Sequence, residues 1–458
     1  MHATARAAQS QRIQAHARNC DSFSFFNTLT SPELFDTLEE LLPAHRERLF
    51  PPTETLSMFL AQALSPDRSC QSIVNDSAVR RLQGGLPRCS THTGGYCRAR
   101  QRLPETMISA LTREAGTLIS QDISTAWHWK GRPVRLVDGT TLTMPDTDDN
   151  QAAWPQSGRQ QPGLGFPLCR MVGVICLGSG ALLNAAISPA RGKGSDEQAL
   201  FRTIFDTLNA GDLMLADAFY PTYFLLCELV RRGIDGVFEQ YGARRENTDE
   251  YRIGSLTKKD YLLRLSRPNK PAWMTDEEYA RMPKSLIVRE CRIKGRQIVT
   301  TMLTEGEATR TELKLLYRER WKVEVDFRNI KDILGMGVLS CRSPEMVRKE
   351  IWIYLLAYNL IRLIMAQTAV AANRCPRSLS FKHSLQIVIR WAHLPAADAI
   401  KLLPDVYILI AQKTVGNRPG RLEPRAVKRR PKPYSLLTRK REEARASIRE
   451  NGHPKKVK

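Results

Sequence analysis

The stretch TELKLLYRERWKVEVDFRNIK, residues 311–331, contains neither Gly nor Pro and consists largely of good helix formers, so it predicts a helix. At about 100° per residue, Tyr317, Arg320, Glu324 and Lys331 share one polar stripe of that helix. A set of apolar residues lies on or beside the stripe and indicates a buried face. Its members are Leu313, Leu316, Val323, Phe327, Ile330 and Leu334.

Glu324 lies at the edge of this buried face, with Arg320 one turn before it and Lys331 two turns after it. A carboxylate between two cations suits a site that holds metal and phosphate together. On the opposite side lie Glu319, Asp326 and Ile333, so Asp326 is expected to face solvent. A salt-bridged surface helix is the alternative interpretation of the same pattern.

The charge of the chain indicates a polyanionic partner. The 458 residues carry a formal charge of +22, and 42% of them are hydrophobic, which is enough for several buried cores. The isoelectric point is near 9.8. Because the basic residues are spread along the chain, nucleic acid is favoured over a membrane surface, with a merely basic protein as the alternative.

Cysteine usage and hydropathy favour a soluble cytosolic protein. The ten cysteines are scattered without a Cys-x-x-Cys pair, which indicates reduced thiols. Cys89, His92 and Cys97 lie close in sequence, but their spacing fits no common zinc site. Residues 1–20 lack the apolar core of a signal peptide. The most apolar segment, 351–366, is interrupted by Asn359 and Arg362, so we expect a buried helix rather than a membrane span.

The chain divides into segments of different pattern. Residues 1–20 are expected to be disordered, and residues 21–130 to form an all-helical DNA-binding module. In that module Arg98, Arg100 and Arg102 lie beside Tyr96, which suits phosphate contact, although a solvated charged face is the alternative. The remaining expected divisions are a core in two parts, 131–242 and 306–415, a β-rich insertion, 243–305, and a basic disordered tail, 416–458.

The core begins with alternating apolar and β-branched residues at 133–144, which predict a strand through Asp138. Two further strands follow around the Gly-Ser-Gly turn at 178–180, and Ser195 with Gln198 predicts the capping box of a helix. The segment 212–218 is expected to be a short buried strand that ends at Asp217. Carboxylates after the first and fourth strands and a Glu on a later helix are the layout of an RNase H-like core with an α/β mixed sheet.

The tail and the C-terminal helices complete the pattern. Long and short helices are expected from 344 to about 371, near 380–393 and near 396–412. From 416 to 458 there are 15 Lys or Arg and 4 Glu, which is +11 of the total +22. Such a segment is expected to be disordered alone and to bind phosphates without sequence preference.

Asp138, Asp217 and Glu324 have the chemistry for metal-dependent strand cleavage. In-line displacement at phosphorus uses two divalent ions about 3.5–4 Å apart, and Mg²⁺ prefers oxygen ligands. Each acid has an alternative role: Asp138-Gly139 could form the turn of a β-hairpin, and Asp217 could begin a loop. Three other acids, Asp146, Asp148 and Asp149, cluster in a polar loop and are expected to be solvated.

These residues resemble a known family. Tyr317, Arg320, Glu324 and Lys331 match the Tyr-x2-Arg-x3-Glu-x6-Lys signature of DDE transposases of the insertion sequence 4 family. VDGT around Asp138 and LADAFY around residue 217 are similar to that family's other two acidic motifs, and the resemblance covers roughly residues 130–370. It implies an RNase H-like fold with a β insertion, and the three acids as ligands of two Mg²⁺ ions, which Mn²⁺ can replace.

The resemblance also implies partners and DNA-binding residues. The expected activity is cut-and-paste movement of a DNA element bounded by inverted repeats, by a homodimer in a synaptic complex with double-stranded transposon ends and target DNA. Tyr317, Arg320 and Lys331 resemble the residues that hold the end phosphates. Trp273, in the insertion, is the candidate for stacking on a flipped base. The alternatives are an RNase H-like nuclease or resolvase and a catalytically inactive DNA-binding protein derived from a transposase.

Overall fold

A computed structural model provides the fold, and it places the following residues with enough certainty to describe them. They are residues 37–38, 40–42, 49–121, 124–245, 248–293, 295–392, 394, 401–416 and 439–452, without the side chains of 243 and 245. The segment 1–20, for which we expected disorder, lies outside them.

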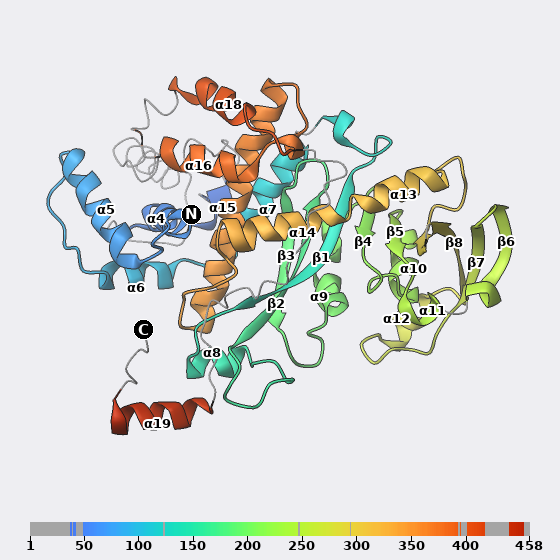
Figure 1. Ribbon diagram of the computed structural model, residues 1–458, viewed down its shortest axis with the longest axis horizontal. Helices are drawn as coiled ribbons and strands as arrows, with labels where there is room; N and C mark the ends of the chain where they lie inside the picture. The colour runs from blue at the N-terminus through green and yellow to red at the C-terminus, as the bar shows by residue number, and fades with distance from the viewer. Residues whose placement is uncertain are drawn as a thin grey trace.

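The described strands form one mixed sheet in the order β3-β2-β1-β4-β5-β9-β8-β7-β6 (Figure 1). β1, β4 and β5 are parallel, and every other neighbouring pair is antiparallel. The strands are β1 (Val134–Thr143), β2 (Leu168–Cys176), β3 (Leu182–Pro189), β4 (Leu213–Ala216), β5 (Asp235–Glu239), β6 (Arg252–Thr257), β7 (Asp260–Ser266), β8 (Ser285–Ile293) and β9 (Arg296–Thr300). With helices on both faces, the sheet confirms the expected α/β class.

The central strands β1 and β4 have the burial that their apolar sequences predict. All four residues of β4 are buried, as is typical of a parallel strand covered on both faces. β1 continues straight through Asp138, which pairs with Gly173 of β2, so the hairpin alternative at Asp138-Gly139 is wrong. Leu136 pairs with Leu215, and β4 ends one residue later while β1 runs on. Asp217 therefore leaves β4 close to the level of Asp138.

Two hydrophobic cores cover the two faces of the sheet. The larger contains the long helix α15 (Pro344–Ala371), and the smaller contains α9 (Glu197–Thr203) and α10 (Tyr223–Arg231). α15 is long and apolar enough to cross a membrane, but 89% of its most apolar window is buried inside the protein. The expected buried helix is therefore confirmed, with Ser343 and Pro344 at its start.

The N-terminal helices pack beside this core. They are α4 (Pro52–Leu64), α5 (Cys70–Gln83), α6 (Gly94–Arg102) and α7 (Glu105–Gln121). Arg100 is buried, stacks 4.8 Å from the ring centroid of Phe59 and donates to Gln62, and Tyr96 is fully buried. The expectation that Arg100 and Tyr96 offer a phosphate-binding surface is therefore wrong, because both belong to the packing of α4 against α6.

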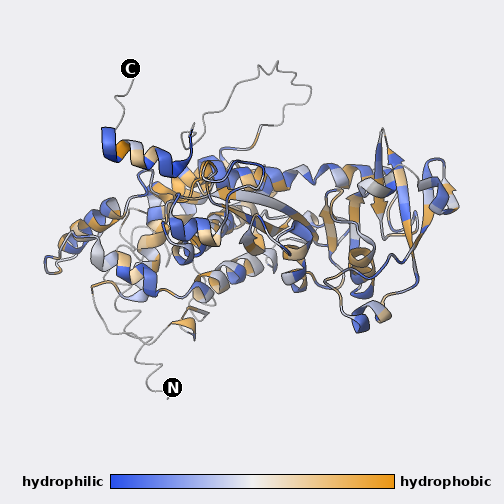
Figure 2. Cartoon of the chain, turned by 90° about the horizontal axis from the view of Figure 1, so that it is seen from below, coloured by the Kyte–Doolittle hydropathy of each residue, from blue (hydrophilic) through white to orange (hydrophobic). Residues whose placement is uncertain are grey.

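The C-terminal part differs from the expected pattern in one place. α16 (Phe381–Trp391) and α18 (Leu403–Ala411) follow α15, and residues 417–438 lie outside the described part. Within the tail expected to be disordered, α19 (Arg441–Asn451) is a helix, and its surface is mainly hydrophilic (Figure 2). Arg441 forms an ion pair with Asp146 and donates to the Gly165 carbonyl at 2.7 Å, so Asp146 is not solvated as expected.

Candidate active site

Residues 311–331 do not form one uninterrupted helix. α13 (Arg310–Arg318) ends before Glu319, α14 (Trp321–Arg328) follows, and residues Asn329–Ile333 form a π-helical turn that contains Lys331. The backbone of Glu319 and Arg320 stays in the α region, so the chain keeps its direction along the sheet (Figure 1). The expected apolar face is confirmed, because all six of its members are buried.

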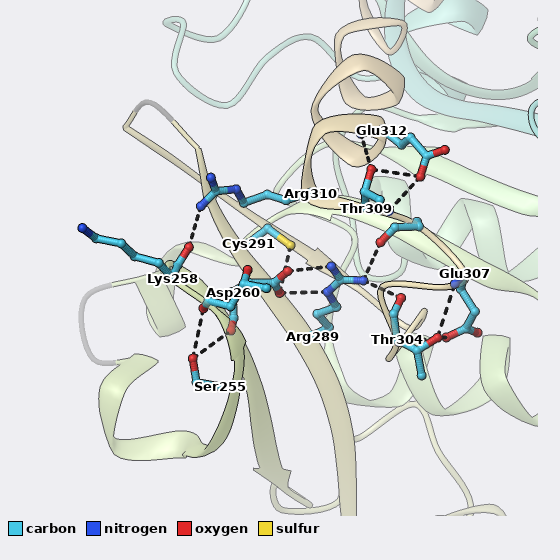
Figure 3. Close-up of polar contacts among 12 residues, drawn as sticks. Ser255, Lys258, Asp260, Arg289, Cys291, Thr304, Glu307, Thr309, Arg310 and Glu312 are labelled. Atoms are coloured by element: carbon cyan, nitrogen blue, oxygen red, sulfur yellow. Dashed lines mark hydrogen bonds and ion pairs between the residues drawn. The ribbon is translucent and has the colours of Figure 1, made fainter.

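The start of α13 is fixed by a buried ion pair in the β6–β9 part of the sheet (Figure 3). Arg289 and Asp260 are both fully buried, with Nη2 2.6 Å from Oδ2. Arg289 Nη1 also donates to the carbonyls of Thr304 and Ala308, each at 2.7 Å. Thr309 then caps α13 in a capping box with Glu312. The helix that carries the signature residues therefore begins at a fixed point.

Asp326 is a correction to the expected solvent face. Its side chain is fully buried and accepts hydrogen bonds from Arg362 Nη2 at 2.7 Å and from Arg377 Nη1 at 2.9 Å. Arg377 also donates to the Leu177 carbonyl at 2.5 Å, between β2 and β3. Both sides of α14 are therefore in contact with protein, and Asp326 fixes the rotation of the helix on which Glu324 lies.

The structure brings Asp138, Arg320 and Glu324 together. Arg320 Nη2 donates to Glu324 Oε1 at 2.9 Å, and Arg320 Nη1 lies 3.6 Å from Asp138 Oδ2. The Gly139 amide donates to the other Asp138 oxygen at 2.8 Å. A guanidinium thus lies between a carboxylate of β1 and a carboxylate of α14. Because Asp326 and the apolar face of this segment are also buried, the alternative of a salt-bridged surface helix is wrong.

Asp217 acts on the same cluster through its charge. It follows β4, and its Oδ1 accepts a hydrogen bond from the Phe219 amide at 2.8 Å. Burial raises the pKa of Asp138 to about 7, and the negative charge of Asp217 adds to the rise, whereas the Gly139 amide and Arg320 oppose it. The two acids therefore repel each other where β4 ends beside the middle of β1.

The other signature residues lie around these acids. Lys331 Nζ donates to Thr140 Oγ1 at 3.0 Å and to the Thr141 carbonyl at 2.9 Å, both on β1. The Tyr317 hydroxyl donates to Glu239 at the end of β5, at 3.4 Å.

Trp273 lies apart from this cluster. Its ring lies 4.1 Å from the Arg202 guanidinium carbon and 6.1 Å from the Phe224 ring. It lines a cavity of about 390 Å³ between α9, α10 and the insertion.

A basic groove adjoins the signature helix. Its cavity of about 470 Å³ lies between β8, β9 and α13. Its cationic and aromatic lining consists of Arg296, Lys314, Tyr317, Arg318, Arg320 and Trp321. The Trp321 side chain is 61% exposed, which is unusual for a residue of this size. Positive charge beside an exposed aromatic ring suits a nucleic-acid strand.

Sequence reasoning missed Glu197 and Tyr220. Asp196, not Ser195, is the N-cap of α9 and accepts from the Ala199 amide at 2.9 Å, so the expected capping box is wrong and Glu197 is the first helical residue. Tyr220 is fully buried, and its hydroxyl has no hydrogen-bond partner in the described structure. Only the motif LADAFY, which contains Tyr220, could have drawn attention to it from the sequence.

The donor set fits hard divalent cations. In the described residues no three His, Cys, Asp or Glu side chains are gathered closely enough to hold a metal ion as they stand. Arg320, however, already places a positive charge between Asp138 and Glu324. Burial, together with the charge of Asp217, raises the pKa of Asp138, and a carboxylate in such surroundings favours either a proton or a cation.

Comparison with known proteins identifies the class. Residues 129–360, about half of the chain, match the family model described as the transposase DDE domain. The chain is 27% identical over 408 residues to the transposase InsG for insertion sequence element IS4 of Escherichia coli K12, which covers 86% of this chain and 89% of the relative. It is 30% identical over 96 residues to the transposase for insertion sequence element IS421 of Escherichia coli, which covers 18% of this chain and 26% of the relative.

A structural comparison pairs 88% of this chain with 88% of the piggyBac transposase in a synaptic complex with hairpin DNA, at a TM-score of 0.45 and 10% identity. The family match shows that the chain belongs to the transposase DDE domain family. The protein is a DDE transposase of the insertion sequence 4 type, as its signature predicted.

Proposed function

We propose that Asp138, Asp217 and Glu324 are the acids with which this transposase cuts its insertion sequence at the terminal inverted repeats and joins it to target DNA. The observation that carries the proposal is the Arg320 guanidinium between Asp138 and Glu324, with the charge of Asp217 acting on the same carboxylate. The cofactor we propose is a pair of Mg²⁺ ions, which Mn²⁺ can replace.

An RNase H-like core is part of this proposal. The order β3-β2-β1-β4-β5, with β1, β4 and β5 parallel, supports it. We propose 131–242 and 306–415 as the two parts of this core with its C-terminal helices, and 243–305 as an insertion. The described strands β6, β7, β8 and β9 fall within that insertion and extend the same sheet. Residues 21–130 are the proposed DNA-binding module.

The residues of the site have distinct parts in the reaction. Divalent ions, when bound, activate the attacking oxygen and stabilise the leaving oxygen of the displacement. Asp138 within β1, Asp217 just after β4 and Glu324 on α14 would hold these ions. Arg320 has a second use, because a guanidinium that pairs with carboxylates is also suited to a phosphate. Lys331, held over β1, and Tyr317 are placed to bind the transposon-end phosphates beside the acids.

The DNA partners follow from the surface around the acids. We propose that the basic groove between β8, β9 and α13 receives a transposon-end strand. Trp273, in its aromatic cavity, is the proposed surface for a flipped base. A homodimer that pairs the two ends, acting on DNA in the bacterial cytoplasm, completes the proposal.

Substitution of each acid tests the assignment. Asp138→Asn, Asp217→Asn and Glu324→Gln keep the shape of the side chain but remove its charge, so each should reduce strand cleavage at least about a thousandfold. Binding of a labelled inverted-repeat end, measured by gel shift, should persist. Glu319→Gln is the matched control, because its side chain is 40% exposed on the same segment and pairs with Lys322.

The outcomes separate the alternatives. Cleavage within about tenfold of wild type in Glu324→Gln would remove that residue from the site. Cleavage by the wild-type protein without joining to target DNA would indicate a nuclease or resolvase. End binding by the wild-type protein with no cleavage in either Mg²⁺ or Mn²⁺ would indicate an inactive DNA-binding derivative.

A further inference from the structure

A fourth carboxylate lies beside the acids of the site, on the other face of the sheet. Along β1, Leu136 belongs to the larger core and Val137 to the smaller one, so Asp138 faces α14 and Gly139 faces α9. A Cβ atom on Gly139 would lie only 2.3 Å from Glu197 Cδ and 2.5 Å from Glu197 Oε1. The Glu197 carboxylate therefore occupies the space of the missing side chain, one residue from Asp138.

Contacts at the start of α9 hold Glu197 in this position. The Arg170 side chain on β2 donates to the Ser195 carbonyl at 2.5 Å, just before the N-cap. The Gln198 side chain donates to the Phe219 carbonyl, in the loop that begins at Asp217. α9 is thereby joined both to β2 and to the segment that follows β4, so Glu197 is held beside the middle of β1, near the end of β4.

Tyr220 supplies a second, independent observation. Its hydroxyl is buried without a hydrogen-bond partner in the described structure. Burial raises the pKa of Tyr220 well above its usual value, and the charges of Glu197, Asp138 and Asp217 add to the rise. Leaving a buried donor unpaired is energetically unfavourable. The phenol therefore has a hydrogen bond to offer to a group that enters between these carboxylates.

We propose that Glu197 is a fourth acidic residue of the metal site, which helps to hold the second divalent ion from the face opposite Glu324. The inference rests on the metal-dependent function proposed above. Its physical reason is charge: Arg320 offsets one of the three negative charges, whereas two divalent ions bring four positive charges. The positive charge of Arg170 also acts on Glu197 and opposes the rise in its pKa that burial and Asp217 cause.

A metal titration that does not depend on catalysis tests the inference. The melting temperature of the full-length protein without DNA is measured against Mn²⁺ concentration for wild type, Glu197→Gln, Glu197→Asp and Asp138→Asn. Glu197→Gln should raise the Mn²⁺ concentration for half-maximal stabilisation about tenfold or more, and Glu197→Asp should raise it less. Asp206→Asn is the control, because that side chain is 89% exposed just beyond α9 and should remain within about twofold of wild type.

Each result decides between the inference and the function on which it rests. If Asp138→Asn weakens the Mn²⁺ response but both Glu197 variants match the control, Glu197 is not part of the metal site and the proposed function stands. If the wild type itself shows no Mn²⁺ response, the metal-dependent function and the inference fail together. High Mn²⁺ should partly restore strand cleavage in Glu197→Gln but not in Asp138→Asn, which a loss of folding alone would not produce.

Discussion

Burial of Asp138 in the fold opposes the ionised form of its carboxylate, which a metal ligand needs. The carboxylate is 16% exposed and close to the charges of Asp217 and Glu197, and burial is the largest cause of its raised pKa of about 7. Its pKa in an unfolded chain is near 3.8. The neutral form is therefore favoured in the folded protein, and ionisation destabilises the metal-free fold.

The pH dependence of stability follows from the upward direction of the Asp138 pKa shift. The contribution of Asp138 to the free energy of unfolding is fully present below about pH 4 and is lost as the pH rises through about 7. Asp138→Asn cannot ionise, so in EDTA it should be more stable than wild type at pH 8, by up to about 4 kcal/mol, and by only about 1 kcal/mol at pH 4.5. Parallel thermal melts at the two pH values check this, and a difference that is the same at both would contradict it.

Asp326 shows why a residue's environment can escape a periodicity argument. A single apolar stripe on 311–331 places Asp326 opposite the core, and that inference assumes solvent on the other side. Here α15 and the turn that carries Arg377 cover that side, and two guanidinium groups neutralise the carboxylate. These partners lie 36 and 51 residues further along the chain, where local pattern carries no information about contact.

At the scale of elements, the sequence predicted the ends of a helix or strand correctly where nearby residues determine them. α15 begins at Pro344 after Ser343 and ends at Ala371, as the pattern predicted, because proline favours the first helical turn. The strand that contains Asp138 was predictable from alternation, and the strand that ends just before Asp217 was predictable from burial. The π-helical turn at 329–333 and the place of Glu197 were not, because both depend on packing between distant elements.

The buried pair of Asp260 and Arg289 yields a prediction about α13. Removing one partner of a buried ion pair leaves an uncompensated charge and typically costs about 3–5 kcal/mol. Asp260→Asn should therefore lower the melting temperature by several degrees, and it should reduce strand cleavage because Arg289 fixes the start of the helix with Tyr317. Asp249→Asn, at a 68% exposed side chain in the same insertion, is the control. A change no larger than that of the control would show that α13 does not depend on this anchor.

At the scale of the whole molecule, positive charge is unevenly distributed between the catalytic core and the C-terminal segment. Residues 416–458 carry +11 of the +22, yet none of the signature residues lies there. α19 docks on the loop between β1 and β2 through Arg441 and through Arg445, whose Nη1 lies 3.6 Å from Asp148. The segment is therefore joined to the core at a loop that continues the strand of Asp138.

Removal of 416–458 should separate affinity from chemistry. Nonspecific DNA binding depends on the release of counterions from phosphates, so at about 0.15 M salt it should fall at least about tenfold in the truncated protein. Metal-dependent cleavage of a saturating transposon end should survive, because Asp138, Asp217 and Glu324 are kept. The measurement compares inverted-repeat and scrambled duplexes at two salt concentrations for full-length and truncated protein.

The rival view is that this segment reads sequence or contacts a partner. A loss confined to the inverted-repeat duplex would support that view and contradict the electrostatic one, whereas equal proportional losses on both duplexes would favour charge alone. Full-length Arg441→Ala is the matched control, since it removes one charge but detaches α19 from Asp146. Because nearly all of the charge remains, it should bind nonspecific DNA within about twofold of wild type. A loss as large as that of the truncated protein would mean that the docked position of α19, rather than its charge, governs binding.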